Sequence, residues 1–178
     1  MRPALALGLV LSGLVLAGCG GGGGKAVARV DGTKVTRDEL DATVAHFDEE
    51  ARREGRPFPK KGSPGFDALR NRLLALLVYR AELELEAKRL GVRVSDFEVA
   101  RRLELGSPGE EGETGDEFVR ETVRSQLLYE RIFREVTRDV RGSSPAAAAR
   151  RNARMTRFLA RMRERHRVRY EPGYAPGS

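Results

Sequence analysis

The stretch VARVDGTKVTRDEL, residues 27–40, decides the fold of this chain. It contains two short runs of β-prone residues separated by Asp31-Gly32, a dipeptide that favours a two-residue hairpin turn because both residues accept a positive φ. Thr36 then stands three residues before Glu39, which is the spacing of a capping box. In that motif the hydroxyl and the carboxylate each accept a hydrogen bond from a backbone N–H that would otherwise lack a partner at a helix start. The sequence therefore predicts a β-hairpin followed at once by a helix.

The rest of the chain is predicted to be mainly helical. The first helix runs to about Glu54, where a segment rich in proline and glycine interrupts it. From Phe66 to Leu90, apolar residues recur every three or four positions and the centre is apolar on nearly every side, so this segment is the expected core helix. Three further helices are expected, from the Ser95–Glu98 capping box to about Leu105, from the Thr114–Glu117 capping box to about Val140, and from Ser144-Pro145 to about His166.

A short β-prone run, Val168–Tyr170, follows the last helix. Our hypothesis is that it pairs with the N-terminal hairpin and so closes the fold by joining its two ends. The expected fold class is mainly α, with an N-terminal β-hairpin, four to five helices and this short C-terminal strand. We expect one folded domain over residues 26–171 and a disordered tail over residues 172–178.

The first residues read as an export signal. Arg2 supplies a positive charge, a short apolar run follows, and small residues precede Cys19, which is the only cysteine of the chain. The apolar run is too short to span a bilayer of about 30 Å as a permanent helix. We expect a signal peptide over residues 1–18 and a glycine-rich tether over residues 19–25.

The run Leu16-Ala17-Gly18-Cys19 resembles the bacterial lipobox. This resemblance implies a lipoprotein in which a diacylglyceryl group with fatty-acyl chains such as palmitate is attached to the Cys19 thiol, and in which cleavage leaves Cys19 as the new N-terminus. The expected location is the bacterial cell envelope, on the extracytoplasmic face of a membrane. The alternative is an ordinary signal peptide that ends at a cysteine by chance.

Composition narrows the classes of partner. The net charge is +7, but tryptophan is absent and aromatic residues make up only 6% of the chain, so platforms for stacking bases or sugars are scarce. An exported protein also meets little nucleic acid. We expect no nucleic-acid or small-molecule partner, and we consider membrane lipid and acidic segments of polypeptides to be the counterparts of the positive charge.

No pattern of catalytic or metal-binding residues stands out. The two histidines, His46 and His166, lie far apart in the sequence, and with one cysteine they offer no zinc-site spacing. The glycine run at 20–24 lacks the Lys-Ser/Thr of a phosphate-binding loop, and no Gly-x-Ser-x-Gly motif is present. We therefore expect a protein that is not an enzyme and that needs no cofactor or metal.

Three segments resemble the N-terminal chaperone module of the SurA family, which is shared by SurA- and PrsA-like periplasmic proteins. They are the opening stretch at 27–40, LEAKRLGVRVSDFEV at 85–99 and the long helix expected from Phe118 to Val140. The resemblance implies a cradle of helices with an apolar groove that binds unfolded or nascent exported polypeptides without ATP. In that family a parvulin-type prolyl isomerase domain often follows the long helix, whereas here only residues 141–144 occupy that place, so isomerase activity is not expected.

The expected function is thus a membrane-anchored holdase or foldase-like chaperone without prolyl isomerase activity. The alternative is an envelope lipoprotein that uses the same fold to dock one dedicated protein partner. Periodicity alone does not separate apolar groove residues from core residues, and the candidates for either role are Leu73, Leu77, Phe97, Phe118, Leu127, Leu128, Phe158 and Met162. A basic rim, for acidic segments of clients or for anionic lipid, is expected at Arg154, Arg157, Arg161 and Arg165.

Overall fold

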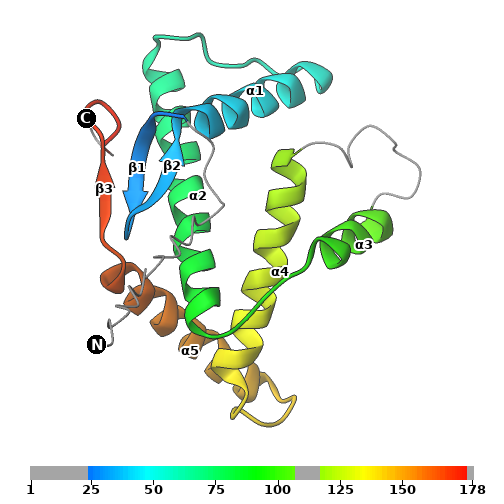
Figure 1. Ribbon diagram of the computed structural model, residues 1–178. Helices are drawn as coiled ribbons and strands as arrows, with labels where there is room; N and C mark the ends of the chain where they lie inside the picture. Colours follow the sequence, from blue (N-terminus) through cyan, green and yellow to red (C-terminus); the bar gives the residue numbers. More distant parts are fainter. Residues whose placement is uncertain (1–23, 107–116, 176–178) are drawn as a thin grey trace, which may run out of the picture.

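The computed structural model describes residues 24–106 and 117–175. The expectations for the signal peptide, for Cys19 and most of the tether, for Thr114 and for residues 176–178 lie outside these ranges. The described elements, in chain order, are β1 (Ala26–Val30), β2 (Thr33–Thr36), α1 (Arg37–Arg53), α2 (Pro64–Arg89), α3 (Asp96–Gly106), α4 (Glu117–Thr137), α5 (Pro145–Arg165) and β3 (Val168–Tyr170) (Figure 1). The mainly helical fold class is confirmed.

The opening stretch folds as predicted. Asp31 and Gly32 both have positive φ angles, 47° and 90°, in the turn between β1 and β2. At the start of α1 the Thr36 N–H donates to Glu39 Oε2 at 2.6 Å, and the Glu39 N–H donates to Thr36 Oγ1 at 3.2 Å. The capping box therefore fixes the direction in which α1 leaves the hairpin.

Helix α2 begins two residues earlier than expected. Ser63 is its N-cap and accepts a hydrogen bond from the Phe66 N–H at 3.2 Å, while Pro64 occupies the first turn. Proline is well suited to that position because its missing N–H would have no partner within the helix. The sequence predicts the same Ser-Pro start for α5, where Ser144 is the N-cap. It does not predict this start for α2, because the prolines and glycines before Ser63 indicate a loop.

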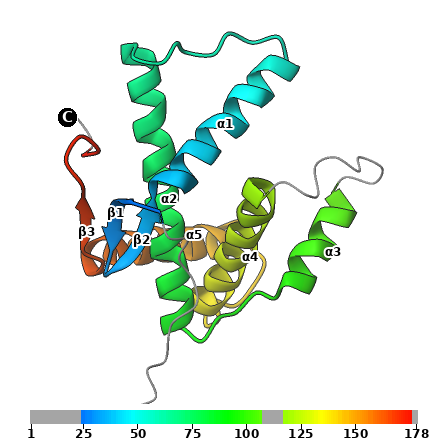
Figure 2. The same ribbon diagram turned by 45° about the horizontal axis from the view of Figure 1, so that its top comes forward.

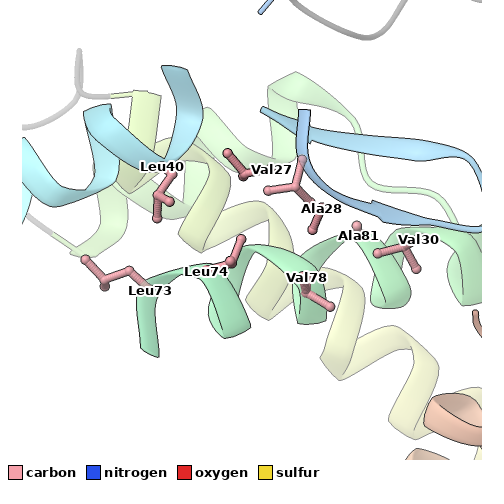
Figure 3. Packing of buried hydrophobic residues seen from close by; sticks show 9 residues of the cluster. Val27, Ala28, Val30, Leu40, Leu73, Leu74, Val78 and Ala81 are labelled. Carbon is pink, nitrogen blue, oxygen red and sulfur yellow. The ribbon is translucent and has the colours of Figure 1, made fainter. Parts of the chain in front are cut away.

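The C-terminal strand closes the sheet as hypothesised. The strand order is β2-β1-β3 with antiparallel pairs, and β3 aligns Val168 with Val30 and Tyr170 with Ala28. The sheet and α2 enclose a first core cluster that includes Val30, Leu74 and Val78 (Figure 3). Because β1 is the central strand, the two ends of the described chain depend on each other for their backbone hydrogen bonds.

Helix α2 passes between two layers. The strands cover one side of it, and α4 and α5 pack on its C-terminal half (Figures 1 and 2). There a second core cluster contains Leu83 of α2, Leu128 and Ile132 of α4, and Phe158 of α5. The expectation that this helix is covered by several partners is confirmed, and its apolar circumference is the reason.

A group of charged side chains around the buried Glu86 joins the sheet to the helices. The Glu86 side chain of α2 is 0% exposed and accepts hydrogen bonds from Arg89, at 2.7 Å, and from Arg165 at the end of α5. His166, the C-cap of α5, places Nε2 3.2 Å from Glu86 Oε1 and Nδ1 2.6 Å from Asp31 Oδ2 in the hairpin turn. These contacts connect α2, α5 and the β1–β2 turn.

Two glutamates one turn apart on α2 have opposite electrostatic environments. Burial raises the pKa of Glu86, but the hydrogen bonds from Arg89 and Arg165 outweigh it and the net pKa is lowered from the ordinary value. Burial also raises the pKa of Glu82, and the charge of Arg163 opposes this change without offsetting it. The ionised form therefore favours the folded state at Glu86 and disfavours it at Glu82.

Deleting residues 167–178 removes β3 and should lower the free energy of unfolding by about 3 kcal/mol or more. The reason is that the half-buried Val168 and Tyr170 leave the first core cluster, where a fully buried side chain of this size contributes about 1.5–3 kcal/mol, and that β1 loses its second partner. Thermal and urea unfolding measure the change. Deleting only residues 176–178 is the control, and an equal effect of both deletions would contradict the assigned role of β3.

Glu86→Gln should lower the free energy of unfolding at pH 7 by about 1–2 kcal/mol, because it removes the negative charge that accepts hydrogen bonds from Arg89 and Arg165, whose own side chains are 46% and 42% exposed. The lowered pKa means that this contribution is present above the ordinary value of 4.5 and is lost as the pH falls through the lowered value, so the loss should shrink towards pH 3. The matched control is Glu82→Gln, which should be neutral or stabilising at pH 7. Urea unfolding at both pH values tests the pair, and equal losses for the two variants at pH 7 would contradict this account.

Candidate functional site

An apolar groove lies between α1, α2 and α4. Its volume is about 610 Å³. In both ribbon views α1 and α4 extend from the same side of α2, and the strands lie on the other side (Figures 1 and 2). We call this site the helical groove, and its lining residues are His46, Phe47 and Glu50 of α1, Leu76, Tyr79, Arg80 and Leu83 of α2, and Phe118, Thr122, Ser125, Gln126, Tyr129 and Glu130 of α4.

The helical periodicity explains how three separate segments line one groove. On α2 the lining residues follow spacings of three and four, as do those on α4, so each helix presents one stripe to the groove. The opposite stripe of α2 carries Leu74, Val78 and Ala81, which belong to the core beneath the sheet. One face of α2 therefore packs beneath the sheet, while Leu76, Tyr79 and Arg80 are partly accessible at the groove and Leu83 joins the groove to the second core cluster.

An aromatic cluster lies where α1 approaches the start of α4. The His46 ring centroid is 4.4 Å from that of Phe118, and the Phe47 ring meets Phe118 edge-on at 5.4 Å. The Arg80 guanidinium lies over the Phe118 ring at 4.6 Å from its centroid, a cation–π geometry. These contacts hold α4 against α1 and α2 at this end and give the groove an aromatic wall.

The polar groups of the groove are largely engaged within the protein. Arg80 Nη2 donates to Thr122 Oγ1 at 2.5 Å, and burial lowers the pKa of Arg80 while the Glu121 and Glu84 carboxylates oppose that change. The Thr122 and Ser125 hydroxyls donate to carbonyl oxygens one turn earlier in α4, at 2.7 and 2.8 Å. With their hydroxyl hydrogens directed to the helix backbone, these side chains present mostly carbon to a ligand.

The structure distributes the apolar candidates from the sequence over different environments. Only Phe118 lines the helical groove. Five others, Leu73, Leu77, Leu128, Phe158 and Met162, are buried or packed against the two core clusters, and Leu127 is half-buried on α4. Phe97 is 73% exposed on α3, away from the groove.

The sequence reasoning missed most of the groove residues. Leu76, Tyr79 and Leu83 form an i, i+3, i+7 stripe on α2, and this spacing was visible but indistinguishable from the core stripe beside it. His46 and Phe47 had no signal of their own, because their place in the groove depends on α4, which is distant in the sequence. Tyr129 also lines the groove, and its 37% exposure is visible only in the structure.

The four arginines of the expected basic rim lie on α5 and have different neighbours. Arg154 pairs with Asp139 at 2.6 Å, and Arg165 pairs with the buried Glu86. Arg157 and Arg161 are exposed and form no ion pair with any described residue. Two of the four arginines thus form ion pairs within the protein.

A second, smaller hollow of about 400 Å³ adjoins the helical groove at Phe47. It lies between α1, the loop after it and the start of α2, and Phe58, Pro59 and Leu69 form part of its apolar surface. Arg72 contributes a positive charge to its lining. The two hollows share Phe47, so an extended ligand in the helical groove has a neighbouring apolar site along α1.

Within the described residues, no three side chains of histidine, cysteine, aspartate or glutamate come together in a way that could hold a metal ion. None of the described helices combines the length and apolar composition needed to cross a bilayer.

Comparison with known proteins gives one match. Residues 4–140 match the family of SurA-like N-terminal domains, a stretch that runs through α4 and ends before α5. No curated protein and no solved structure matches the chain. Domains of this family are non-catalytic, chaperone-like modules that act outside the cytoplasm on client polypeptides. Since the match covers most of the chain, this protein belongs to the SurA-like N-terminal domain family.

Proposed function

We propose that this protein is a lipid-anchored chaperone of the bacterial cell envelope that holds unfolded exported polypeptides and has no prolyl isomerase activity. The observation that carries the proposal is an open apolar groove, walled by three helices, in a domain of a chaperone family. The groove is large enough for a few side chains of an extended segment, and it adjoins the second core cluster at Leu83.

The lining of the groove suits weak binding to many sequences. Apolar and aromatic side chains give contact area without demanding a particular hydrogen-bond pattern. The few charges of the lining, on Glu50, Glu130 and Arg80, are of mixed sign, and Glu130 pairs with Arg102 at 3.1 Å, so the groove favours no strongly charged client. Release then requires no nucleotide, because such contacts are individually weak and exchange readily with solvent.

The short connection between α4 and α5 is the reason that the proposed function includes no isomerase activity. In the related proteins, a parvulin domain is often inserted at this place. Here α4 ends at Thr137 and α5 begins at Pro145, and the Arg151 side chain spans the connection by donating to the carbonyl oxygens of Val140 and Gly142 at 3.1 and 2.8 Å. The remaining exposed arginines of α5, Arg157 and Arg161, are proposed to attract acidic segments of clients.

The groove is tested by its effect on protein aggregation. Leu76→Gln with Tyr129→Gln should reduce, several-fold, the ability of the lipid-free chain to suppress light scattering by a chemically unfolded model protein. Both residues line the groove and neither belongs to the core clusters, so the fold should be retained. Circular dichroism and thermal unfolding verify the fold, and the lipid-free chain begins at residue 19 with Cys19→Ser, which keeps every described element.

The matched control is Phe97→Gln with Leu105→Gln, which removes two apolar side chains that are each 73% exposed on α3. It should leave suppression unchanged. A loss in this control instead of the groove variant would move client binding to α3. If the parent chain fails to suppress aggregation over a wide range of salt, and crosslinking in cells recovers a single saturable partner, the chaperone function is wrong and the protein docks one dedicated partner.

Anchoring is tested at Cys19. We expect the protein made in a bacterial host to begin at Cys19, to carry a diacylglyceryl group there and to sediment with membranes. Mass spectrometry of the N-terminal peptide and metabolic labelling with a fatty acid measure this. Cys19→Ser should abolish labelling, and a labelled or normally processed Cys19→Ser protein would contradict the proposed anchor.

A further inference from the structure

We propose that the outer face of the β-sheet is a contact surface for the anionic phospholipid headgroups of the anchoring membrane. This inference rests on the lipid anchor in the proposed function, and it adds an orientation. The residues that carry it are Lys34 of β2, Arg29 of β1 and Arg169 of β3, which we call the cationic row.

The strand register places these three side chains on one face. Arg29 is paired with Lys34 on one side and with Arg169 on the other, and directly paired residues of antiparallel strands point to the same face. The neighbouring pairs, of Ala28 and Val30 with their partners on β3, point to the opposite face and bury against α2. Lys34 and Arg169 are exposed, and neither forms an ion pair with any described residue.

The row is unfavourable for the sheet on its own. Like charges directly opposite each other on neighbouring strands are destabilising. Glu171 offsets part of this repulsion, but its Oε1 is 3.9 Å from Arg29 Nε and both side chains are 42% exposed, so the pair is weak. A layer of anionic headgroups would neutralise all three cations together, since each basic side chain near such a surface gains about 1 kcal/mol.

The position of the row relative to the anchor supports a membrane as the anion. Lys25, which is also exposed, immediately precedes β1, and Arg29 lies about 13 Å further along the same strand. The six residues from Cys19 to Gly24 span at most about 20 Å. An acylated Cys19 therefore keeps the sheet within reach of the headgroups of its own membrane.

The orientation has a consequence for the helical groove. The sheet packs on the face of α2 that carries Leu74 and Val78, whereas Leu76 and Tyr79 line the groove. The strands lie on one side of α2, and α1 and α4, which wall the groove, lie on the other (Figure 1). A domain that rests on the membrane through the sheet holds the groove away from the lipid. Apolar client segments then reach the groove without competition from the bilayer surface.

The test measures vesicle binding by the lipid-free chain, which separates surface contact from anchoring. The chain that begins at residue 19 with Cys19→Ser should co-sediment with vesicles of mixed phosphatidylglycerol and phosphatidylcholine, not with pure phosphatidylcholine. Binding should disappear in about 1 M salt, where the Debye length falls to about 3 Å. Lys34→Glu with Arg169→Glu should lower the partition coefficient about 20-fold or more, because two favourable charges are lost and two unfavourable ones are added.

The same variant should unfold at a higher temperature than the parent, since each new glutamate lies opposite Arg29 and turns a repulsive pair into an attractive one. A merely structural role of the row predicts the opposite change. Suppression of aggregation in solution should be unaffected, so failure of this inference is distinguishable from failure of the chaperone function.

Two further variants decide between surfaces. Lys60→Glu with Lys61→Glu makes the same change in net charge on the exposed loop between α1 and α2, and it should retain most of the vesicle binding. Equal losses in both double variants would show that binding follows net charge and would overturn the inference. So would a loss confined to Arg157→Glu with Arg161→Glu, which would place the membrane contact on α5, and so would parent binding to pure phosphatidylcholine.

Discussion

The rest of the structure depends on covering α2. This helix is apolar around much of its circumference, and a helix of that kind is stable in water only when other elements bury it. The sheet buries one face, while α4 and α5 bury the C-terminal half. The face towards α1 and the start of α4 is covered incompletely, and the helical groove occupies that gap. The requirement that gives the domain its cores thus also leaves the surface on which the proposed function depends.

The way α2 is covered explains the buried charges. Its C-terminal half must meet both α5 and the β1–β2 turn, which come from opposite ends of the chain. Glu86 of α2 pairs with Arg165 and lies 3.2 Å from His166. His166 in turn pairs with Asp31 of the turn. A buried ion pair adds little net stability compared with apolar packing. In this fold its contacts join α2, the end of α5 and the β1–β2 turn next to the point where the chain turns from α5 into β3.

Local signals in the sequence predicted the elements well and the groove poorly, for a physical reason. Capping boxes such as Thr36–Glu39 and Ser95–Glu98 are interactions within four residues, so the sequence alone reveals them. The pairing of β3 with β1 was also foreseeable, because one isolated β-prone run needed a partner and the hairpin offered one. The groove is different, since Leu76 and Tyr79 lie on a helix whose core stripe has the same spacing. Only the position of α4 decides which stripe stays accessible, and no local rule specifies that position.

A groove of this kind need not bind tightly if the domain is held where its clients emerge. Attachment of a binding site to a surface raises its effective concentration there without any new contact. Weak, mixed contacts such as those around Phe118 and Arg80 then suffice for capture, and they also permit release without ATP. The repulsion within the cationic row also favours the membrane-bound state. The three like charges destabilise the sheet in solution, and anionic headgroups would neutralise them. On this argument the cationic row lowers the stability of the free protein and gives the domain a defined orientation at the membrane.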